Sequence, residues 1–207
     1  MKYIIMCGGD YHVDTPRHLL EVKGEPIVTR TIRLLKENGI PISDIFISAT
    51  DDRFGAFSVV LLKHNNTFGN GGRWLDAFYP TNEPVCYIFG DVVFSPDAIK
   101  TIVEYQTDSI MFFASAEPLP PHYLKKWAEP FAYKVADTDL FRSCITVTKH
   151  YSDIGLFKRE PIAWELWQVI KGTPLNNIDY KNYIAINDYT CDCESPEQLS
   201  FMEGAIK

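Results

Sequence analysis

Short apolar runs recur through the first half of the chain and alternate with segments of helical periodicity. The run at residues 3–7, Tyr-Ile-Ile-Met-Cys, ends at a glycine pair, which is typical of a strand buried on both faces of a parallel sheet. Repeated strand–helix–strand units at this spacing indicate an α/β fold, a three-layer α/β/α Rossmann-like domain with a mostly parallel mixed sheet. The pattern predicts strands at 3–7, 45–49, 58–62, 85–89 and 110–114, and helices at 26–38, 72–78 and 96–105.

The helix predicted at 26–38 is amphipathic. Its residues Val28, Ile32 and Leu35 fall on one stripe, which we expect to face the sheet. The same periodicity places the charged side chains on the solvent face, namely Arg30, Arg33, Lys36 and Glu37.

The pattern changes after Ser115. Four prolines between residues 116 and 130 predict a loop or an excursion from the sheet. We interpret 1–207 as a single domain, with a nucleotide-binding half at 1–115 and a more irregular half at 116–207. For the second half we expect strands at 131–135, 144–148 and 183–186, a helix at 161–170 that packs through Trp164 and Trp167, and a terminal helix that begins at Ser195.

The charge balance excludes several classes of partner. The 207 residues carry 20 Lys and Arg against 27 Asp and Glu, a net charge of −7. This argues against a sequence-independent nucleic-acid binder and against an anchor on anionic lipid, both of which need a basic face. No apolar run approaches the roughly 20 residues of a membrane span, and the first apolar run is too short for a signal peptide. We therefore expect no nucleic-acid or membrane partner.

Cysteine usage indicates a reducing compartment. Five cysteines is an odd and low count, so a disulfide framework is not expected and we place the protein in the cytoplasm. Cys191 and Cys193 lack further ligands at a zinc spacing, and we predict one buried thiol and one exposed thiol there.

The glycine pair Gly8-Gly9 is the first candidate for chemistry. A glycine pair directly after a strand lets the backbone approach a ligand, and ligands of parallel sheets bind beyond the carboxyl ends of the strands. Backbone amides in such a turn can hold phosphate oxygens. The segment is neither a dinucleotide fingerprint nor a phosphate loop that ends in Gly-Lys-Ser/Thr. A tight turn without a ligand explains the glycines equally well.

Four segments in order resemble the sugar-phosphate nucleotidyltransferase family, a group with a GT-A-like fold. Residues 16–26, Pro-Arg-His-Leu-Leu-Glu-Val-Lys-Gly-Glu-Pro, match without a gap the family's Pro-Lys-x-Leu-Leu-x-Val-x-Gly-Lys-Pro, which follows its glycine-rich loop. Residues 67–72 resemble the glycine turn near the nucleobase, and residues 87–94 resemble the strand that ends in Gly-Asp. Residues 192–199 resemble the late Asp-x-Asp-Thr-Pro-Glu-Asp-Leu motif. The resemblance covers most of the chain.

The resemblance implies a reaction and a metal. Such enzymes transfer a nucleoside monophosphate from a nucleoside triphosphate to a phosphorylated small-molecule acceptor and release pyrophosphate, often for polysaccharide assembly. It implies Mg2+ held by Asp91, with Glu194 as the second carboxylate. Asp192, two residues earlier, shares a face with Glu194 in an extended segment, so either carboxylate can serve. The alternative role for Asp91 is that of a turn residue after a strand. For Asp192 and Glu194, the alternative is a solvated position at the start of a helix.

The family pattern also implies the remaining site residues. Arg17 and Asp91 take the catalytic positions, and residues 116–207 form the acceptor-binding half. The stretch at 154–157 resembles the family's substrate-proximal strand, with Asp153 and Lys158 beside it as acceptor-binding candidates. A homodimer is compatible with this interpretation. The implied nucleotide-binding residues are Cys7, Gly8, Gly9, Asn66, Gly69, Gly71, Gly72 and Arg73.

The loop after Gly9 departs from the family pattern. It contains Asp10, His12 and Asp14 but no arginine, and Arg17 stands where the family has lysine. Two carboxylates repel a triphosphate unless a cation intervenes. The sequence thus leaves three hypotheses open: an active enzyme with a rearranged site, an enzyme with an unusual acceptor, and a catalytically degenerate binding or regulatory domain.

A metal-dependent glycosyltransferase of related fold is a further alternative. Such enzymes hold the metal-bound sugar nucleotide with Asp-x-Asp at a strand end. The segment Gly90-Asp91-Val92-Val93 lacks the second carboxylate, which disfavours this hypothesis.

Overall fold

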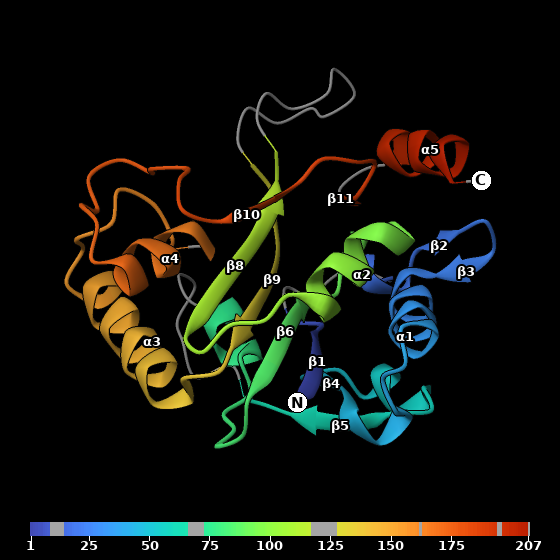
Figure 1. Cartoon of the computed structure of the whole chain (residues 1–207), viewed down its shortest axis with the longest axis horizontal. Coiled ribbons are helices and arrows are strands. Elements are labelled where there is room, and N and C mark those ends of the chain that lie inside the picture. The colour runs from blue at the N-terminus through green and yellow to red at the C-terminus, as the bar shows by residue number, and fades with distance from the viewer. Residues whose placement is uncertain (9–14, 66–72, 117–127, 162, 194–195, 207) are drawn as a thin grey trace.

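A seven-stranded sheet with the strand order β10-β8-β9-β6-β1-β4-β5 forms the middle of the molecule (Figure 1). The computed structural model describes all residues except 9–14, 66–72, 117–127, 162, 194–195 and 207. Strand β9 is antiparallel to both of its neighbours, and the other strands run in one direction. The strands are β1 (Lys2–Met6), β4 (Ile45–Ala49), β5 (Val60–Lys63), β6 (Val85–Phe89), β8 (Ile110–Ser115), β9 (Pro130–Val135) and β10 (Ile184–Ile186).

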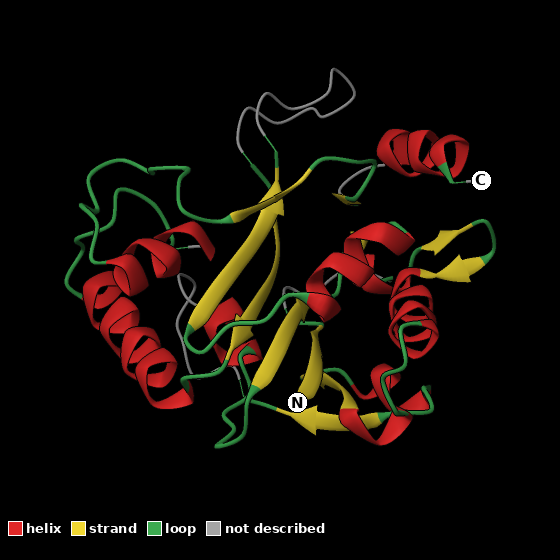
Figure 2. Ribbon diagram, in the orientation of Figure 1, coloured by secondary structure: helices red, strands yellow, loops and turns green. Residues whose placement is uncertain are grey.

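Helices cover both faces of this sheet, which confirms the three-layer prediction (Figure 2). Helices α1 (Ile27–Glu37) and α2 (Pro96–Glu104) pack on one face, and α3 (Thr138–Asp153) and α4 (Ala163–Lys171) pack on the other. Among the described residues, no helix is long and apolar enough to cross a membrane. The described part of the chain also contains the 3-10 helices η1 (Arg17–Leu19), η2 (Ile42–Asp44), η3 (Asp52–Ala56) and η4 (Arg73–Ala77).

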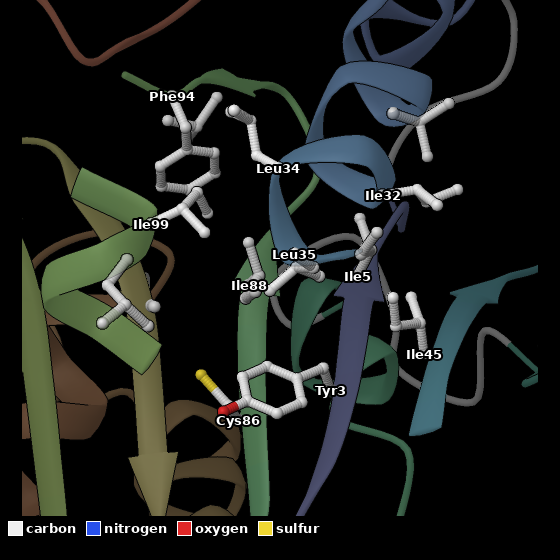
Figure 3. Close-up of a cluster of buried hydrophobic side chains, with 14 of the residues drawn as sticks. Tyr3, Ile5, Ile32, Leu34, Leu35, Ile45, Cys86, Ile88, Phe94 and Ile99 are labelled. Carbon is white, nitrogen blue, oxygen red and sulfur yellow. The ribbon is translucent and has the colours of Figure 1, made fainter. Parts of the chain in front are cut away.

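Strand β1 shows how the apolar runs build two cores. Its side chains alternate, so Tyr3 and Ile5 join the core under α1 and α2, whereas Ile4 and Met6 join the core under α3 and α4. Figure 3 shows the first core, where Leu35 of α1 lies over the sheet beside Ile5 and Ile88. A strand buried on both faces needs an uninterrupted apolar run, as the sequence has at this position.

The C-terminal part of the chain forms a third, smaller core. Helix α5 (Pro196–Ala205) packs against the hairpin of β2 (Glu21–Val22) and β3 (Glu25–Pro26). Two further short strands, β7 (Val92–Val93) and β11 (Cys191–Asp192), pair antiparallel beside it. The buried apolar side chains of this core are Val22, Ile27, Val93, Cys191, Cys193, Met202 and Ile206.

The strand predicted at 144–148 is wrong, because this segment lies inside α3. The side chain of Asp137 accepts a hydrogen bond from the Leu140 amide and caps the helix at its start. Helical spacing then places Phe141, Cys144 and Thr148 on one buried face, against the second core. The stretch at 154–157 is not a strand either, since Ile154 caps the end of α3.

Four smaller predictions are also corrected. The strand expected from residue 58 begins at Val60, and the helix expected at 72–78 is the 3-10 helix η4. Arg30 does not face solvent: it is buried, and its Nε donates to the Phe94 carbonyl at 3.2 Å. Cys191 and Cys193 are both buried, because β11 contributes to the third core. Trp164 and Trp167 are buried on α4 as predicted.

Candidate functional site

The carboxyl ends of β1 and β6 lie side by side and set the position of the candidate site. The two strands pair in parallel with Met6 opposite Phe89, and the Gly90 amide donates to the Met6 carbonyl at 2.9 Å. Cys7-Gly8 and Gly90-Asp91 therefore leave the sheet next to each other. This is the edge at which ligands bind in open α/β sheets.

Close packing requires glycine at both strand ends. A Cβ at Gly90 would lie 2.7 Å from the Met6 carbonyl oxygen and 2.8 Å from the Cys7 sulfur. A Cβ at Gly8 would lie 2.7 Å from the Ala77 Cβ, so Gly8 lets η4 approach the end of β1. Packing alone thus accounts for these two glycines, and the tight-turn alternative remains open for Gly8.

We expect Gly90→Ala to lower the free energy of unfolding by about 1–3 kcal/mol, because the added methyl group meets a backbone atom that cannot move aside. Urea unfolding monitored by circular dichroism measures this difference. Gly204→Ala in α5 is the matched control, since a Cβ there has no neighbour within 4 Å and alanine favours a helix. Equal stability of wild type and Gly90→Ala would contradict the packing argument.

Asp91 is half-buried at the turn that follows β6. Burial raises the pKa of the Cys7 thiol well above its usual value, and the nearby charge of Asp91 raises this pKa further. The carboxylate of Asp91 is therefore close to the segment that begins the glycine turn. Cys7 stays a neutral thiol and contributes packing instead of charge.

The late carboxylate segment meets Asp91 through the β7–β11 pairing. Cys191 pairs with Val93 and Asp192 pairs with Val92, and the Cys193 amide donates to the Asp91 carbonyl at 2.9 Å. Asp192 is buried with 6% of its surface exposed. Two segments about a hundred residues apart in sequence thus lie together at the end of β6.

Arg17 and His18 come from η1, which lies after residues 9–14, a segment outside the described part of the chain. Arg17 is exposed, whereas His18 is buried, and its ring meets Phe54 edge-on at a centroid distance of 5.7 Å. A Cβ added at Gly90 would lie 3.0 Å from His18 Cδ2. The histidine ring therefore packs against the Gly90-Asp91 turn. Sequence reasoning missed His18, and its place beside Arg17 in the matched motif was the available signal.

Burial lowers the pKa of His18 to about 4, and the neighbouring Arg17 charge acts in the same direction. The unfolded chain, with a histidine pKa near 6.5, therefore binds more protons than the native state between these pH values. We expect the unfolding free energy to fall by about 3 kcal/mol as the pH drops from about 6.5 to about 4.

Urea unfolding at a series of pH values measures this linkage. His18→Gln removes the titrating ring and should flatten the pH dependence, whereas His150→Gln, an exposed residue of α3, should leave it unchanged. The same pH slope in His18→Gln and in wild type would show that other groups cause the loss of stability.

The structure does not group the acceptor candidates with Asp91. Asp153 ends α3 on the opposite face of the sheet from α1, and it is exposed. Lys158 is also exposed, and its Nζ lies 3.5 Å from Asn177 Oδ1. Arg73 begins η4. The other predicted residues lie outside the described part of the chain: Gly9, Asn66, Gly69, Gly71, Gly72 and Glu194.

The described donor set fits a hard cation that needs few protein ligands. Within the described residues, no three His, Cys, Asp or Glu side chains lie close enough to hold a metal together. Mg2+ usually retains several waters and takes one or two carboxylates plus substrate phosphates. Asp91 and Asp192 each carry carboxylate oxygens of this kind, and their backbone segments meet at the end of β6.

Comparison with solved structures finds the same fold in nucleotidyltransferases. The chain superposes on the inositol-1-phosphate CTP transferase of T. maritima with a TM-score of 0.59 and 12% identity, over 100% of this chain and 97% of the other. The superposition on CTP:phosphocholine cytidylyltransferase from Streptococcus pneumoniae has a TM-score of 0.52 and 15% identity. It covers 100% of this chain and 99% of the other. The superposition on a Bacillus anthracis protein assigned as a glucose-1-phosphate thymidylyltransferase has a TM-score of 0.60 and 17% identity. It covers 98% of this chain and 94% of the other.

Sequence comparison adds no family assignment. No family model matches the chain, and no curated protein matches it. The structural likeness therefore establishes the fold, and the chain spans nearly the whole length of these structural neighbours.

Proposed function

We propose that this chain is a nucleotidyltransferase that transfers a nucleoside monophosphate from a nucleoside triphosphate to a sugar phosphate or a small alcohol phosphate. The observation that carries the proposal is the meeting of Gly8, Asp91 and the Asp192 segment at the carboxyl edge of the sheet. The fold shared with a cytidylyltransferase and with a CTP transferase supports the class of reaction.

The reaction is a displacement at phosphorus. An oxygen of the acceptor phosphate attacks the α-phosphorus of the triphosphate, and a new P–O bond forms. The bond from the α-phosphorus to the oxygen that bridges to the β-phosphate breaks, and its electron pair leaves with pyrophosphate. Both reactants are anions, so the site must neutralise charge and hold the two groups in line.

Asp91 and one carboxylate of the late segment, Asp192 or Glu194, are the residues that would hold Mg2+. When bound, this ion would supply charge neutralisation at the phosphate oxygens. Asp91 suits the role because β6 and the hydrogen bond from the Cys193 amide fix its backbone. The chain's own contribution is the rigid turn that keeps this carboxylate at the edge of the sheet.

Arg17 is the cation that we assign to the triphosphate. It is exposed at the start of η1, while the next residue, His18, is buried against the Gly90 turn and anchors the local backbone. A guanidinium group binds two phosphate oxygens in a fixed geometry, which a lysine ammonium cannot reproduce.

The other assignments complete the proposal. Residues 66–72 and Arg73 would contact the nucleotide, and Asp153 and Lys158 would contact the acceptor. Products of this kind feed polysaccharide assembly, and we place the reaction in the cytoplasm.

A pyrophosphate-release assay tests the function. The protein is incubated with each of the common nucleoside triphosphates, Mg2+ and a panel of sugar phosphates and alcohol phosphates, and released pyrophosphate is measured with a coupled pyrophosphatase. We expect release that needs one preferred triphosphate, an acceptor and Mg2+ together. Tight nucleotide binding in thermal-shift measurements without release from any acceptor would support the degenerate binding domain instead.

A further inference from the structure

Three residues form a closed ring of hydrogen bonds where the late segment meets α2. Asp188 Oδ2 accepts from the Ser95 hydroxyl at 2.5 Å, and Asp188 Oδ1 accepts from the Thr190 amide at 2.7 Å. The Ser95 amide donates to the Thr190 hydroxyl at 3.0 Å and closes the ring. Ser95 and Thr190 are buried, with 3% and 1% of their surfaces exposed. We call Ser95, Asp188 and Thr190 the Asp188 ring.

The ring is tied into two helices. The Ser95 hydroxyl also accepts from the Ala98 amide at 2.9 Å and caps the start of α2. Arg30 of α1 joins the same two segments, since its Nε donates to the Phe94 carbonyl and its Nη2 donates to the Tyr189 hydroxyl, both at 3.2 Å. The backbone around the ring is therefore held from α1 and α2 together.

The ring lies directly before β11, the strand that contains Asp192. The β7–β11 pairing spans only two residues on each strand. A shift of the register by one residue would turn every side chain of β11 to the other face. The Asp188 ring fixes β11 at its beginning, and the bond from the Cys193 amide to the Asp91 carbonyl fixes it at its end.

We infer that Asp188 is a positioning residue for the proposed metal site. Its two carboxylate oxygens set the register of β11 and thereby place the backbone of Asp192 relative to that of Asp91. This inference rests on the proposed function for the role of the carboxylates, whereas the register itself is a property of the metal-free protein. Partners that orient metal ligands typically change metal affinity by 10–100-fold when they are removed.

Asp188→Ala and Thr190→Val test the inference. Valine keeps the shape of threonine and removes the ring hydroxyl, whereas Thr190→Ser keeps a hydroxyl and should restore most of the wild-type behaviour. Asp179→Ala is the control for loss of a carboxylate, because Asp179 pairs with Lys181 in the preceding loop, outside the ring.

Hydrogen exchange of the Cys193 amide in the metal-free protein is the first measurement. We expect this amide to exchange at least about tenfold faster in Asp188→Ala and Thr190→Val, because β11 loses its fixed register. The rates in Thr190→Ser and Asp179→Ala should stay near wild type. Unchanged protection in both ring variants would overturn the inference, whatever the protein catalyses.

The Mg2+ dependence of nucleotide binding is the second measurement. Calorimetric titration with a non-hydrolysable triphosphate analogue should show that the ring variants need about 10–100-fold more Mg2+ for half-maximal binding. Their affinity for the analogue without Mg2+ should change little. An equal loss with and without Mg2+ would indicate a merely structural role and contradict the inference. If the wild type binds no analogue, the proposed function fails, while the exchange experiment still decides the register.

Discussion

Asp91→Asn is expected to lower the Mg2+-dependent turnover number by at least about a thousandfold while the protein remains folded. Asparagine keeps the shape of aspartate but removes the charge that would hold the cation. Metal neutralisation of phosphate charge contributes several kcal/mol to such reactions, and each 1.36 kcal/mol corresponds to a factor of ten in rate. Steady-state pyrophosphate release at saturating substrate measures the effect.

Asp108→Asn is the control for this prediction. Asp108 is exposed and precedes β8, at the end of the sheet opposite the candidate site. Its substitution should leave turnover unchanged. If Asp91→Asn retains near wild-type turnover at low Mg2+, Asp91 is not the principal metal ligand, and the late carboxylates would have to hold the cation alone.

Arg17→Ala is expected to reduce kcat/KM by roughly a hundredfold, which corresponds to about 3 kcal/mol of transition-state stabilisation. Arg17 is the one permanent cation between Asp10 and His18 in the sequence. Under the proposed function it would supply the charge that the family resembled by this sequence divides between an arginine and a lysine. Arg17→Lys should recover only part of the loss, because an ammonium group does not provide the paired donors of a guanidinium.

Lys36→Ala, on the exposed face of α1, serves as the control for loss of a surface cation. An active Arg17→Ala variant beside an inactive Asp10→Ala/Asp14→Ala double variant would contradict the role of Arg17. That result would show that a metal ion held by the loop carboxylates organises the triphosphate.

The sequence was sufficient to predict the central strands β1 and β6. Strands β1 and β6 are buried on both faces, and such strands leave uninterrupted apolar runs. The runs end at Gly8 and at Gly90-Asp91, so the carboxyl edge of the sheet and Asp91 could be predicted together. Both features depend on local pattern, which periodicity reports well.

The segment at 144–148 shows where local pattern fails. Cys-Ile-Thr-Val-Thr is rich in β-branched residues and favours a strand by intrinsic preference. The cap at Asp137 and the burial of every third or fourth side chain in the second core override this preference. The deciding contacts come from α4 and the sheet, which no local window contains.

The contacts around the late segment could not be predicted for a related reason. Arg30 was assigned to solvent because it is charged, but its partners, Phe94 and Tyr189, lie 64 and 159 residues away in the chain. Burial of both Cys191 and Cys193 follows from the same third core. The resemblance predicted that the late segment approaches Asp91, and the β7–β11 pairing brings the two backbones together. The hydrogen bonds of the Asp188 ring could be found only in the structure.

Phosphorus NMR of a complete reaction tests the proposed transfer most directly. The protein is mixed with its preferred nucleoside triphosphate, Mg2+ and the best phosphorylated acceptor, and the spectrum is followed over time. Nucleotidyl transfer predicts that the triphosphate signals decline while equal amounts of pyrophosphate and of a diphosphate linked to both nucleoside and acceptor appear. Unchanged triphosphate signals with every acceptor, or inorganic phosphate as the sole product, would contradict it.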